Sequence, residues 1–391
     1  IQAVSFNYDR NRWKFLDPKV EEDFQALEKL CPGEITVGSR SLADDKWVVA
    51  FLQDAGPVKY YLWDRAKKEG TYLFTNRKSL EGLPLAKMRP TVVKSRDGFD
   101  LMCYLTLPVD SASGGADARP TKPLPMVLLV HGGPWARDAW GFNPIHQLLA
   151  NRGYAVMSVN FRGSTGFGKK FLNAGNKEWA GKMHTDLLDA VDYAVNQGIA
   201  DKQKVAIMGG SYGGYATLVG LTFTPDVFAC GVDIVGPSNI LTLLSTIPPY
   251  WAPQVKVFHD RVGDPGKEKE FLLSRSPLTH VEKIKKPLLI GQGAKDPRVK
   301  QAESDQIVKA MQEKNIPVTY ALFPDEGHGF ARPENNQSFF AVTDVFLSQH
   351  LGGRSEPLSG ETFQGSTMQA PAGAGLIPGL ESNLPKPPAG K

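Results

Sequence analysis

Residues 205–220 read VAIMGGSYGGYATLVG. Four apolar residues, a glycine-rich turn around Ser211 and a second apolar run follow one another, which predicts a buried strand, a sharp turn and a helix. The turn has the pattern Gly-x-Ser-x-Gly, in which glycines two positions either side of the serine leave room for a backbone that turns tightly. This context predicts a nucleophile elbow, the turn that presents a reactive serine at the edge of an α/β sheet.

Short, continuous apolar runs recur on both sides of this elbow. Strands that are buried on both faces read as such runs. They are expected at residues 126–130, 155–159, 205–208, 231–235, 288–290 and 319–323. Segments with apolar residues at three- and four-residue spacing lie between them and predict helices. The expected fold class is therefore α/β, a mostly parallel sheet covered by helices on both faces.

The first ninety residues have a different rhythm and predict a small antiparallel sheet. Turns with Asp, Gly and Pro separate four expected strands, at residues 35–39, 47–52, 59–63 and 71–75. Four such strands equal one blade of a β-propeller, which is too few to close a ring. We therefore divide the chain into a partial propeller over residues 1–90, an α/β domain over residues 91–352, and a Gly- and Pro-rich tail over residues 353–391 that is expected to be irregular.

Two residues downstream of Ser211 are candidates to activate its hydroxyl. A serine needs a neighbouring base, and that base is held in one tautomer by an acid. His328 lies in the glycine-flanked segment EGHG just past an expected strand, and Asp296 also follows a buried strand. The chain order Ser211, Asp296, His328 is the order of α/β-hydrolases. We predict that these three residues form a catalytic triad.

Other acids compete with Asp296 for this role. Asp325 and Glu326 are so close to His328 in the sequence that they would not reach its imidazole comfortably from below. Asp233 follows its own expected strand and is the next alternative. The sequence prefers Asp296 and leaves these alternatives open.

The anionic intermediate of acyl transfer needs preorganised hydrogen-bond donors. The backbone amide of Tyr212, directly after the serine, is one expected donor. Gly132 and Gly133 follow the strand at residues 126–130, and glycine there lets the backbone approach a substrate closely. We predict that this pair supplies the second donor of an oxyanion hole.

Composition argues against several other functions. Basic and acidic residues number 45 and 41, without the dense basic run that a nucleic-acid interface needs. No run approaches the roughly 20 apolar residues of a membrane span. The three cysteines are far apart, so neither a disulfide framework nor a metal site is expected, and no cofactor is predicted. The chain begins with Ile1 rather than methionine, so its compartment, cytoplasmic, secreted or periplasmic, is left open, as is any homo-oligomer.

Five motifs together resemble the prolyl oligopeptidase family of serine peptidases, most closely its acylaminoacyl-peptidase and dipeptidyl-aminopeptidase-like branch. They occur in family order: VHGGP at 130–134, NFRGSTGFG at 160–168, GSYGGY at 210–215, DPRV at 296–299 and EGHGF at 326–330. The resemblance covers the α/β domain and implies an α/β-hydrolase fold preceded by a propeller.

The resemblance also implies parts of the function. It implies that Arg298 binds a substrate carbonyl near the scissile bond, and that His131 stands where some relatives carry an oxyanion-binding tyrosine. The implied substrates are short peptides or acyl-peptides, cleaved through an acyl-enzyme. The alternatives are a carboxylesterase that acts on small esters and a non-catalytic binding domain with a hydrolase fold.

Several aromatic residues near these motifs have two interpretations. They could line an apolar acyl or side-chain pocket, or they could pack in the core or in a lid. They are Trp135, Trp140, Phe142, Tyr250 and Trp251. The sequence does not separate the two interpretations.

Overall fold

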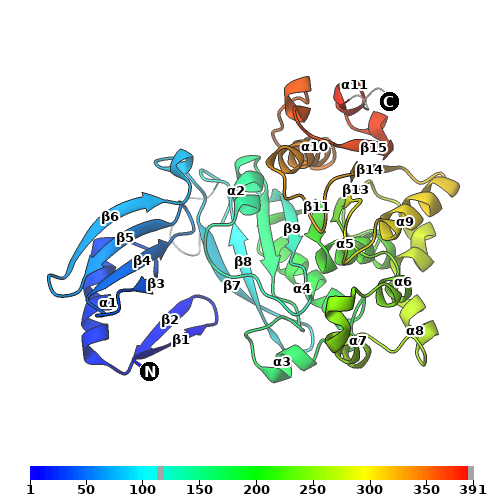
Figure 1. The fold of residues 1–391 in the computed structure, drawn as a ribbon. Helices are drawn as coiled ribbons and strands as arrows, with labels where there is room; N and C mark the ends of the chain where they lie inside the picture. The colour runs from blue at the N-terminus through cyan, green and yellow to red at the C-terminus, as the bar shows by residue number, and fades with distance from the viewer. Residues whose placement is uncertain (112–118, 386–391) are drawn as a thin grey trace.

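A nine-stranded sheet forms the centre of the larger part of the molecule in the computed structural model, which describes residues 1–111 and 119–385 (Figure 1). Its strand order is β15-β14-β13-β12-β11-β9-β10-β8-β7, and neighbours from β14 to β10 are parallel. The strands are β7 (Met88–Lys94), β8 (Asp100–Thr106), β9 (Leu124–Val130), β10 (Ala155–Val159), β11 (Ala200–Gly210), β12 (Cys230–Ile234), β13 (Leu288–Gly293), β14 (Val318–Phe323) and β15 (Gln369–Ala372). The α/β-hydrolase fold predicted from the sequence is confirmed.

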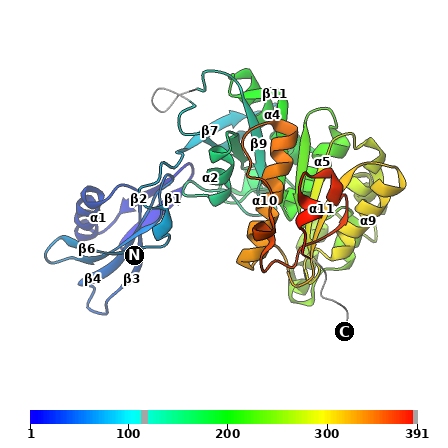
Figure 2. The ribbon, with the colours of Figure 1, turned by 90° about the horizontal axis from the view of Figure 1, so that it is seen from above.

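Helices cover both faces of this sheet, which explains the continuous apolar runs. Successive side chains of a strand point to opposite faces. Along β9, Met126 and Leu128 join one hydrophobic cluster, whereas Val127 and Leu129 join another. The first cluster includes α4 (Lys182–Asn196), α5 (Tyr212–Phe223) and α9 (Gln301–Glu313), and the second includes α2 (Pro144–Asn151) and α10 (Pro333–Leu351) (Figure 2).

Four shorter helices lie in the connections between strands. Helix α3 (Lys169–Asn173) follows β10. The long connection from β12 to β13 carries α6 (Ile240–Ser245), α7 (Val255–Arg261) and α8 (Lys269–Ser274). This connection leaves the sheet at the same edge as the elbow, because β11 and β12 are parallel neighbours.

The N-terminal part holds the small antiparallel sheet that the sequence predicts. It consists of β3 (Glu34–Arg40), β4 (Lys46–Leu52), β5 (Lys59–Asp64) and β6 (Glu69–Thr75), in that order. Helix α1 (Pro18–Leu30) packs on it through Phe24 and Leu27, which share a buried cluster with Trp47. The four predicted strands are confirmed.

A hairpin that the sequence analysis does not predict joins this part to the larger domain. Strands β1 (Ala3–Asn7) and β2 (Asn11–Phe15) pair antiparallel. The hydroxyl of Tyr104 donates to the carbonyl of Asp9 at 2.9 Å, and Arg137 donates to the carbonyls of Asn7 and Tyr8 at 2.8 and 2.7 Å. The hairpin turn therefore lies against the loop that follows the glycine pair Gly132-Gly133.

The C-terminal segment differs from the irregular tail expected over residues 353–391. Its apolar side chains pack against α10 and the neighbouring sheet face: Leu358, Phe363, Met368, Ile377 and Leu380 are all buried. It adds β15 antiparallel to β14 and ends with α11 (Leu380–Asn383). Residues 112–118 and 386–391 lie outside the described residues.

Candidate active site

Ser211 occupies a strained turn between β11 and α5. Its φ and ψ angles are 58° and −117°, in a region that residues with a Cβ atom rarely adopt. A Cβ atom at Gly209 would lie 2.5 Å from the carbonyl oxygen of Val130, and one at Gly213 would lie 2.1 Å from it. Both positions therefore require glycine, as the elbow pattern predicts. The amide of Ser211 donates to the carbonyl of Ile234 at 2.8 Å, which ties the turn to β12.

His328 and Asp296 form a hydrogen-bonded pair at the same sheet edge. The Nδ1 atom of His328 lies 2.6 Å from Oδ2 of Asp296. Parallel strands end at one edge, and the loops after β13 and β14 carry Asp296 and His328, whereas Ser211 directly follows β11. The side chain of Asp296 is fully buried and that of His328 is 15% exposed. This arrangement holds the imidazole from one side and leaves its Nε2 atom for another partner.

The second oxygen of Asp296 is held by the backbone of its own loop. Oδ1 accepts hydrogen bonds from the amides of Arg298 at 2.8 Å and Val299 at 2.9 Å. Within the described residues, the Ser211 hydroxyl makes no hydrogen bond to His328. Such contacts are often long before a substrate is bound.

The rival acids have other partners in the structure. Asp325 binds Arg332, Asn335 and Thr367, and Glu326 accepts from the amides of Ala331 and Arg332 and from Asn335. These bonds place both acids at the start of α10, away from the imidazole nitrogens. Neither shares a hydrogen bond with His328 in the described part of the chain.

Asp233 does not follow its strand, as the sequence analysis expects, but lies inside β12 beneath the elbow. It is fully buried, and its Oδ1 atom accepts from the amide of Gly236 at 2.8 Å, while Oδ2 has no partner among the described residues. Burial raises the pKa of the Asp233 carboxyl well above its usual range. A Cβ atom at Gly214 would lie 2.2 Å from Oδ1, so the carboxyl is packed directly against the first turn of α5.

The glycine pair lies beside the serine, as an oxyanion hole requires. A Cβ atom at Gly132 would lie 3.0 Å from the carbonyl oxygen of Gly210 and 3.3 Å from the Cβ atom of Ser211. The Tyr212 amide belongs to the first turn of α5, where amides have no partner within the helix. The ring of Tyr212 is buried against Phe161 and Trp179, so only its backbone faces the turn.

His131 fixes the glycine pair from behind, a role that the sequence analysis does not identify. Its ring stacks on Phe161 with centroids 4.5 Å apart, and Nε2 lies 2.9 Å from the hydroxyl of Ser164. Its Nδ1 atom lies 2.7 Å from the carbonyl oxygen of Gly132. If Nδ1 carries the proton, the bond fixes the peptide plane between Gly132 and Gly133 and therefore the direction of the Gly133 amide.

Part of the predicted aromatic set gathers near these loops. Trp135 packs edge-on against Phe258 with centroids 5.2 Å apart, and Trp251 stacks on Phe258 at 5.8 Å. The guanidinium of Arg298 lies 5.7 Å from the ring centre of Trp251, and it has no ion-pair partner in residues 1–111 and 119–385. The cluster thus spans from the loop that contains Gly132 and Gly133, called the glycine loop, to the loop 293–299 that carries Asp296, called the acid loop.

Trp140 and Phe142 lie elsewhere. Arg10 covers the ring of Trp140 at 3.6 Å, and the indole nitrogen donates to the carbonyl of Met88 at 2.9 Å. Arg77 lies 5.5 Å from the ring centre of Phe142. Both rings therefore pack at the boundary with the N-terminal part, which favours the packing interpretation for these two residues.

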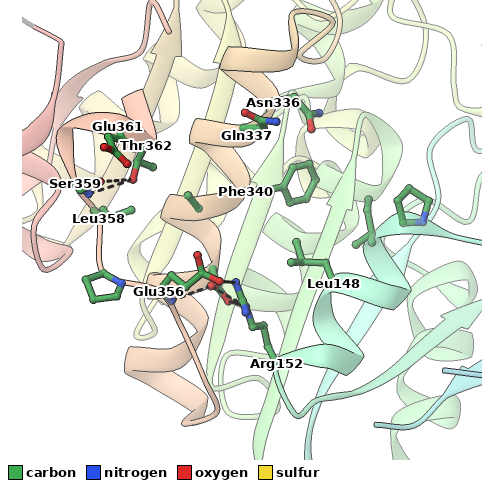
Figure 3. A pocket seen from close by; sticks show the side chains of 15 residues that line it. Leu148, Arg152, Asn336, Gln337, Phe340, Glu356, Leu358, Ser359, Glu361 and Thr362 are labelled. Atoms are coloured by element: carbon green, nitrogen blue, oxygen red, sulfur yellow. Dashed lines mark hydrogen bonds and ion pairs between the residues drawn. The ribbon is translucent and has the colours of Figure 1, made fainter. Parts of the chain in front are cut away.

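A groove of about 630 Å³ lies away from the candidate triad, between α2, α10 and the C-terminal segment (Figure 3). Leu148 and Phe340 line it, and Arg152 binds Glu356 and Asp344 at its side. None of Ser211, Asp296 and His328 lines this groove. It is therefore not the pocket in which the candidate chemistry occurs.

Three further observations concern metal ligands, thiols and membrane helices in the described residues. No three His, Cys, Asp or Glu side chains gather there as a metal site would need. Burial raises the pKa of the Cys230 thiol to about 12, so that thiol is unreactive at neutral pH. No helix in the described part is long and apolar enough to cross a membrane.

Comparison with known proteins places these features in a family context. A model of the prolyl oligopeptidase family matches residues 140–354, which is more than half of the chain. The dipeptidyl aminopeptidase BIII of Pseudoxanthomonas mexicana is 61% identical over 386 residues, 98% of this chain and 56% of that protein. The dipeptidyl peptidase family member 6 of Caenorhabditis elegans is 45% identical over 385 residues, 94% of this chain and 52% of that protein.

Solved structures show the same architecture. A puromycin-hydrolyzing peptidase of Mycobacterium tuberculosis aligns with a TM-score of 0.72 and 25% identity, over 80% of this chain and 47% of that one. The acylaminoacyl peptidase of Pyrococcus horikoshii aligns with a TM-score of 0.73 and 22% identity, over 92% of this chain and 56% of that one. The chain thus spans about half the length of the relatives that it matches.

Proposed function

Because the chain belongs to the prolyl oligopeptidase family of serine peptidases, we propose that it hydrolyses peptide bonds of short peptides through an acyl-enzyme on Ser211. The observation that carries the proposal is the 2.6 Å bond between His328 and Asp296, at the sheet edge where the elbow presents Ser211. An acid, a base and a strained serine converge there on one edge, as acyl transfer requires. The His328–Asp296 bond and the elbow together speak against a non-catalytic binding domain.

In the proposed mechanism, His328 accepts the proton of the Ser211 hydroxyl through Nε2 while the oxygen attacks the substrate carbonyl carbon. The oxyanion of the intermediate accepts hydrogen bonds from the amides of Tyr212 and the Gly132-Gly133 pair. His328 then gives its proton to the leaving amine, and the acyl group stays on Ser211. A water molecule, deprotonated by the same imidazole, releases the acid and restores the serine. Asp296 stabilises the imidazolium in both halves.

The aromatic cluster and Arg298 suggest how a peptide is held. We propose that Trp135, Trp251 and Phe258 form an apolar wall for a substrate side chain, since they bridge the glycine loop and the acid loop. The guanidinium of Arg298 is exposed above Trp251 and has charged N–H groups that suit a peptide carbonyl. A peptide substrate can contact both the apolar wall and the guanidinium of Arg298, whereas a small ester lacks the groups for these contacts.

The relatives favour the release of dipeptides from a peptide N-terminus. The two relatives aligned over 98% and 94% of this chain carry dipeptidyl names. The acylamino-acid-releasing enzyme of Arabidopsis thaliana aligns over only 58% of the chain, at 30% identity. We therefore propose that the protein prefers peptides with a free N-terminus, from which it releases a dipeptide, over acyl-peptides. Small esters are expected to react at the same serine without being the main substrates, so a dedicated carboxylesterase is not favoured.

A panel of chromogenic substrates tests this proposal on the purified protein. Dipeptide anilides, acyl-amino-acid anilides and nitrophenyl esters are compared by kcat/KM, with the Ser211→Ala protein as the blank. The dipeptide anilides are expected to be cleaved with the highest kcat/KM among the anilides. Ester hydrolysis without cleavage of any anilide above the blank would overturn the peptidase assignment.

A further inference from the structure

The loop that carries Asp296 is closed at its base by one buried side chain. Gln292 lies in β13 and is fully buried. Its Nε2 atom donates to the carbonyl oxygen of Gly293 at 3.0 Å and to that of Val299 at 3.1 Å. One amide group therefore bonds to both ends of the loop 293–299. A polar side chain in the middle of a buried strand is costly unless its partners are satisfied.

Val299 connects this side chain to the acid. Its carbonyl oxygen accepts from Gln292, and its amide donates to Oδ1 of Asp296 at 2.9 Å. With Oδ1 occupied in this way, Oδ2 of Asp296 is directed to Nδ1 of His328 at 2.6 Å. A chain of three hydrogen bonds thus leads from Gln292 to the imidazole.

Ser304, in the first turns of α9, orients the amide of Gln292. The Ser304 side chain is buried, and its hydroxyl donates to Oε1 of Gln292 at 2.8 Å. This bond assigns the acceptor end of the amide to Ser304 and the donor end to the loop carbonyls. An ionised glutamate at the same place could accept from Ser304 but could not donate to Val299.

We infer that Gln292 is a positioning residue for the proposed hydrolysis, which acts through Val299 to keep Asp296 on His328. The inference rests on the proposed function. A purely structural Gln292 would support the fold without affecting the pair. The two roles separate in the rate of the chemical step on a nitrophenyl ester, which does not use Arg298 of the same loop, because a displaced acid lowers kcat and leaves binding of this substrate unchanged.

The main test replaces Gln292 by leucine, which has a similar volume and no hydrogen bonds. For Gln292→Leu we expect kcat on the nitrophenyl ester to fall about tenfold or more with KM within about twofold, since one lost hydrogen bond next to a charged group has an effect of this size. The matched control is Gln306→Leu, because Gln306 lies on α9 and binds Ser238, Thr242 and Glu303 but not the acid loop. The control should keep kcat even where it lowers the free energy of unfolding.

A spectroscopic readout tests the pair without turnover. The Nδ1 proton shared with Asp296 is expected to give a low-field proton NMR signal, which can be recorded in the Ser211→Ala background. We expect Gln292→Leu to broaden or shift this signal and Gln306→Leu to leave it unchanged. Gln292→Glu should regain activity relative to the native protein as the pH falls, because only a protonated carboxyl can donate to Val299.

The outcomes separate the inference from the proposed function. If Gln292→Leu does not fold, Ser304→Ala removes only the bond that orients the amide, and it should lower kcat by about threefold to tenfold. A folded Gln292→Leu or Ser304→Ala protein with native kcat and a native low-field signal would overturn the positioning role. Retained turnover in Ser211→Ala would instead overturn the proposed function itself.

Discussion

The imidazole of His328 and the carboxylate of Asp296 are 32 positions apart in the chain, yet Nδ1 lies 2.6 Å from Oδ2. Each residue follows a different parallel strand, so the pair exists only because β13 and β14 are neighbours in the sheet. The Asp296 carboxylate accepts from Nδ1 and therefore fixes the tautomer in which Nε2 accepts a proton. Everything proposed for Ser211 depends on this pair.

Replacement of the serine tests the nucleophile. Ser211→Ala should lower kcat by about three orders of magnitude or more, because the hydroxyl takes part in the chemistry and the elbow backbone does not need it. The measurement is initial rates on the best anilide together with thermal unfolding. Ser382→Ala, at an exposed serine of α11, is the control and should change neither quantity. A rate near the native one in Ser211→Ala would remove the serine from the mechanism.

The two candidate acids are separated by parallel substitutions. Asp296→Asn should lower kcat by about two to four orders of magnitude, since the amide can stabilise the wrong tautomer of His328. Asp233→Asn should change kcat by less than about fivefold, because Asp233 bonds to Gly236 and not to the imidazole. Rates on one anilide under identical conditions make the comparison. A larger loss in Asp233→Asn than in Asp296→Asn would reverse the assignment.

The close approach of the glycine loop to the serine is testable at Gly132. A methyl group there would meet the carbonyl oxygen of Gly210 at 3.0 Å and the Cβ atom of Ser211 at 3.3 Å. Gly132→Ala should therefore displace the oxyanion donors and lower kcat by up to about a hundredfold, with a smaller change in KM. Gly360→Ala, where a Cβ atom has no neighbour within 4 Å, is the control. Equal kcat values in the two variants would contradict the predicted role of the glycine pair.

The sequence predicts much of this site because the relevant signals are local. The elbow around Ser211 is a contiguous pattern, and the strands before Asp296 and His328 are short apolar runs. The position of Gln292 carries only a weak signal, one polar residue in the apolar stretch LLIGQG. Its partners Val299 and Ser304 become neighbours only when the loop after β13 closes, so their hydrogen bonds are not readable from the sequence.

Composition misleads at the C-terminus for a physical reason. Glycine and proline account for 13 of the 39 residues of the tail, which is typical of irregular segments. The apolar residues that fix it, such as Leu358, Phe363 and Ile377, are far apart and follow no helical or strand period. They pack because α10 and the adjacent sheet face leave an apolar surface to cover. Tertiary contact, and not local propensity, orders this segment.

Arg298 provides a test of peptide recognition. Its guanidinium has no ion-pair partner in the described residues and lies above Trp251, so its removal should not disturb a salt bridge. Arg298→Ala should lower kcat/KM on peptide anilides by about tenfold, the usual size of a charge-assisted hydrogen bond, and should spare nitrophenyl acetate. Lys295→Ala, an exposed cation of the same loop, is the control. Equal losses on ester and peptide would show that Arg298 supports the loop instead of the substrate.

The buried carboxyl of Asp233 predicts a pH dependence of stability. It is packed between Gly214 and Gly236, at which added Cβ atoms would lie 2.2 and 2.3 Å from its Oδ1 atom. Burial raises its pKa in the folded protein well above 3.8, whereas the unfolded chain has a pKa close to the ordinary value. Between these two pKa values the folded state holds a proton that the unfolded state has lost. The free energy of unfolding contributed by this group therefore falls as the pH rises, by at most about 1.4 kcal/mol per pH unit.

Asp233→Asn keeps the shape and the bond to Gly236 but removes this titration. Urea unfolding of both proteins at pH 4.5, 6 and 7.5 gives the difference in the free energy of unfolding. Other buried acids whose pKa is raised, Glu303 and Asp186 among them, are present in both proteins and cancel. The variant should therefore become more stable relative to the native protein as the pH rises from 4.5. Only in the native protein does unfolding release a proton from residue 233, and a higher pH favours that release. Parallel pH profiles for the two proteins would show that the Asp233 carboxyl is not protonated in the folded state.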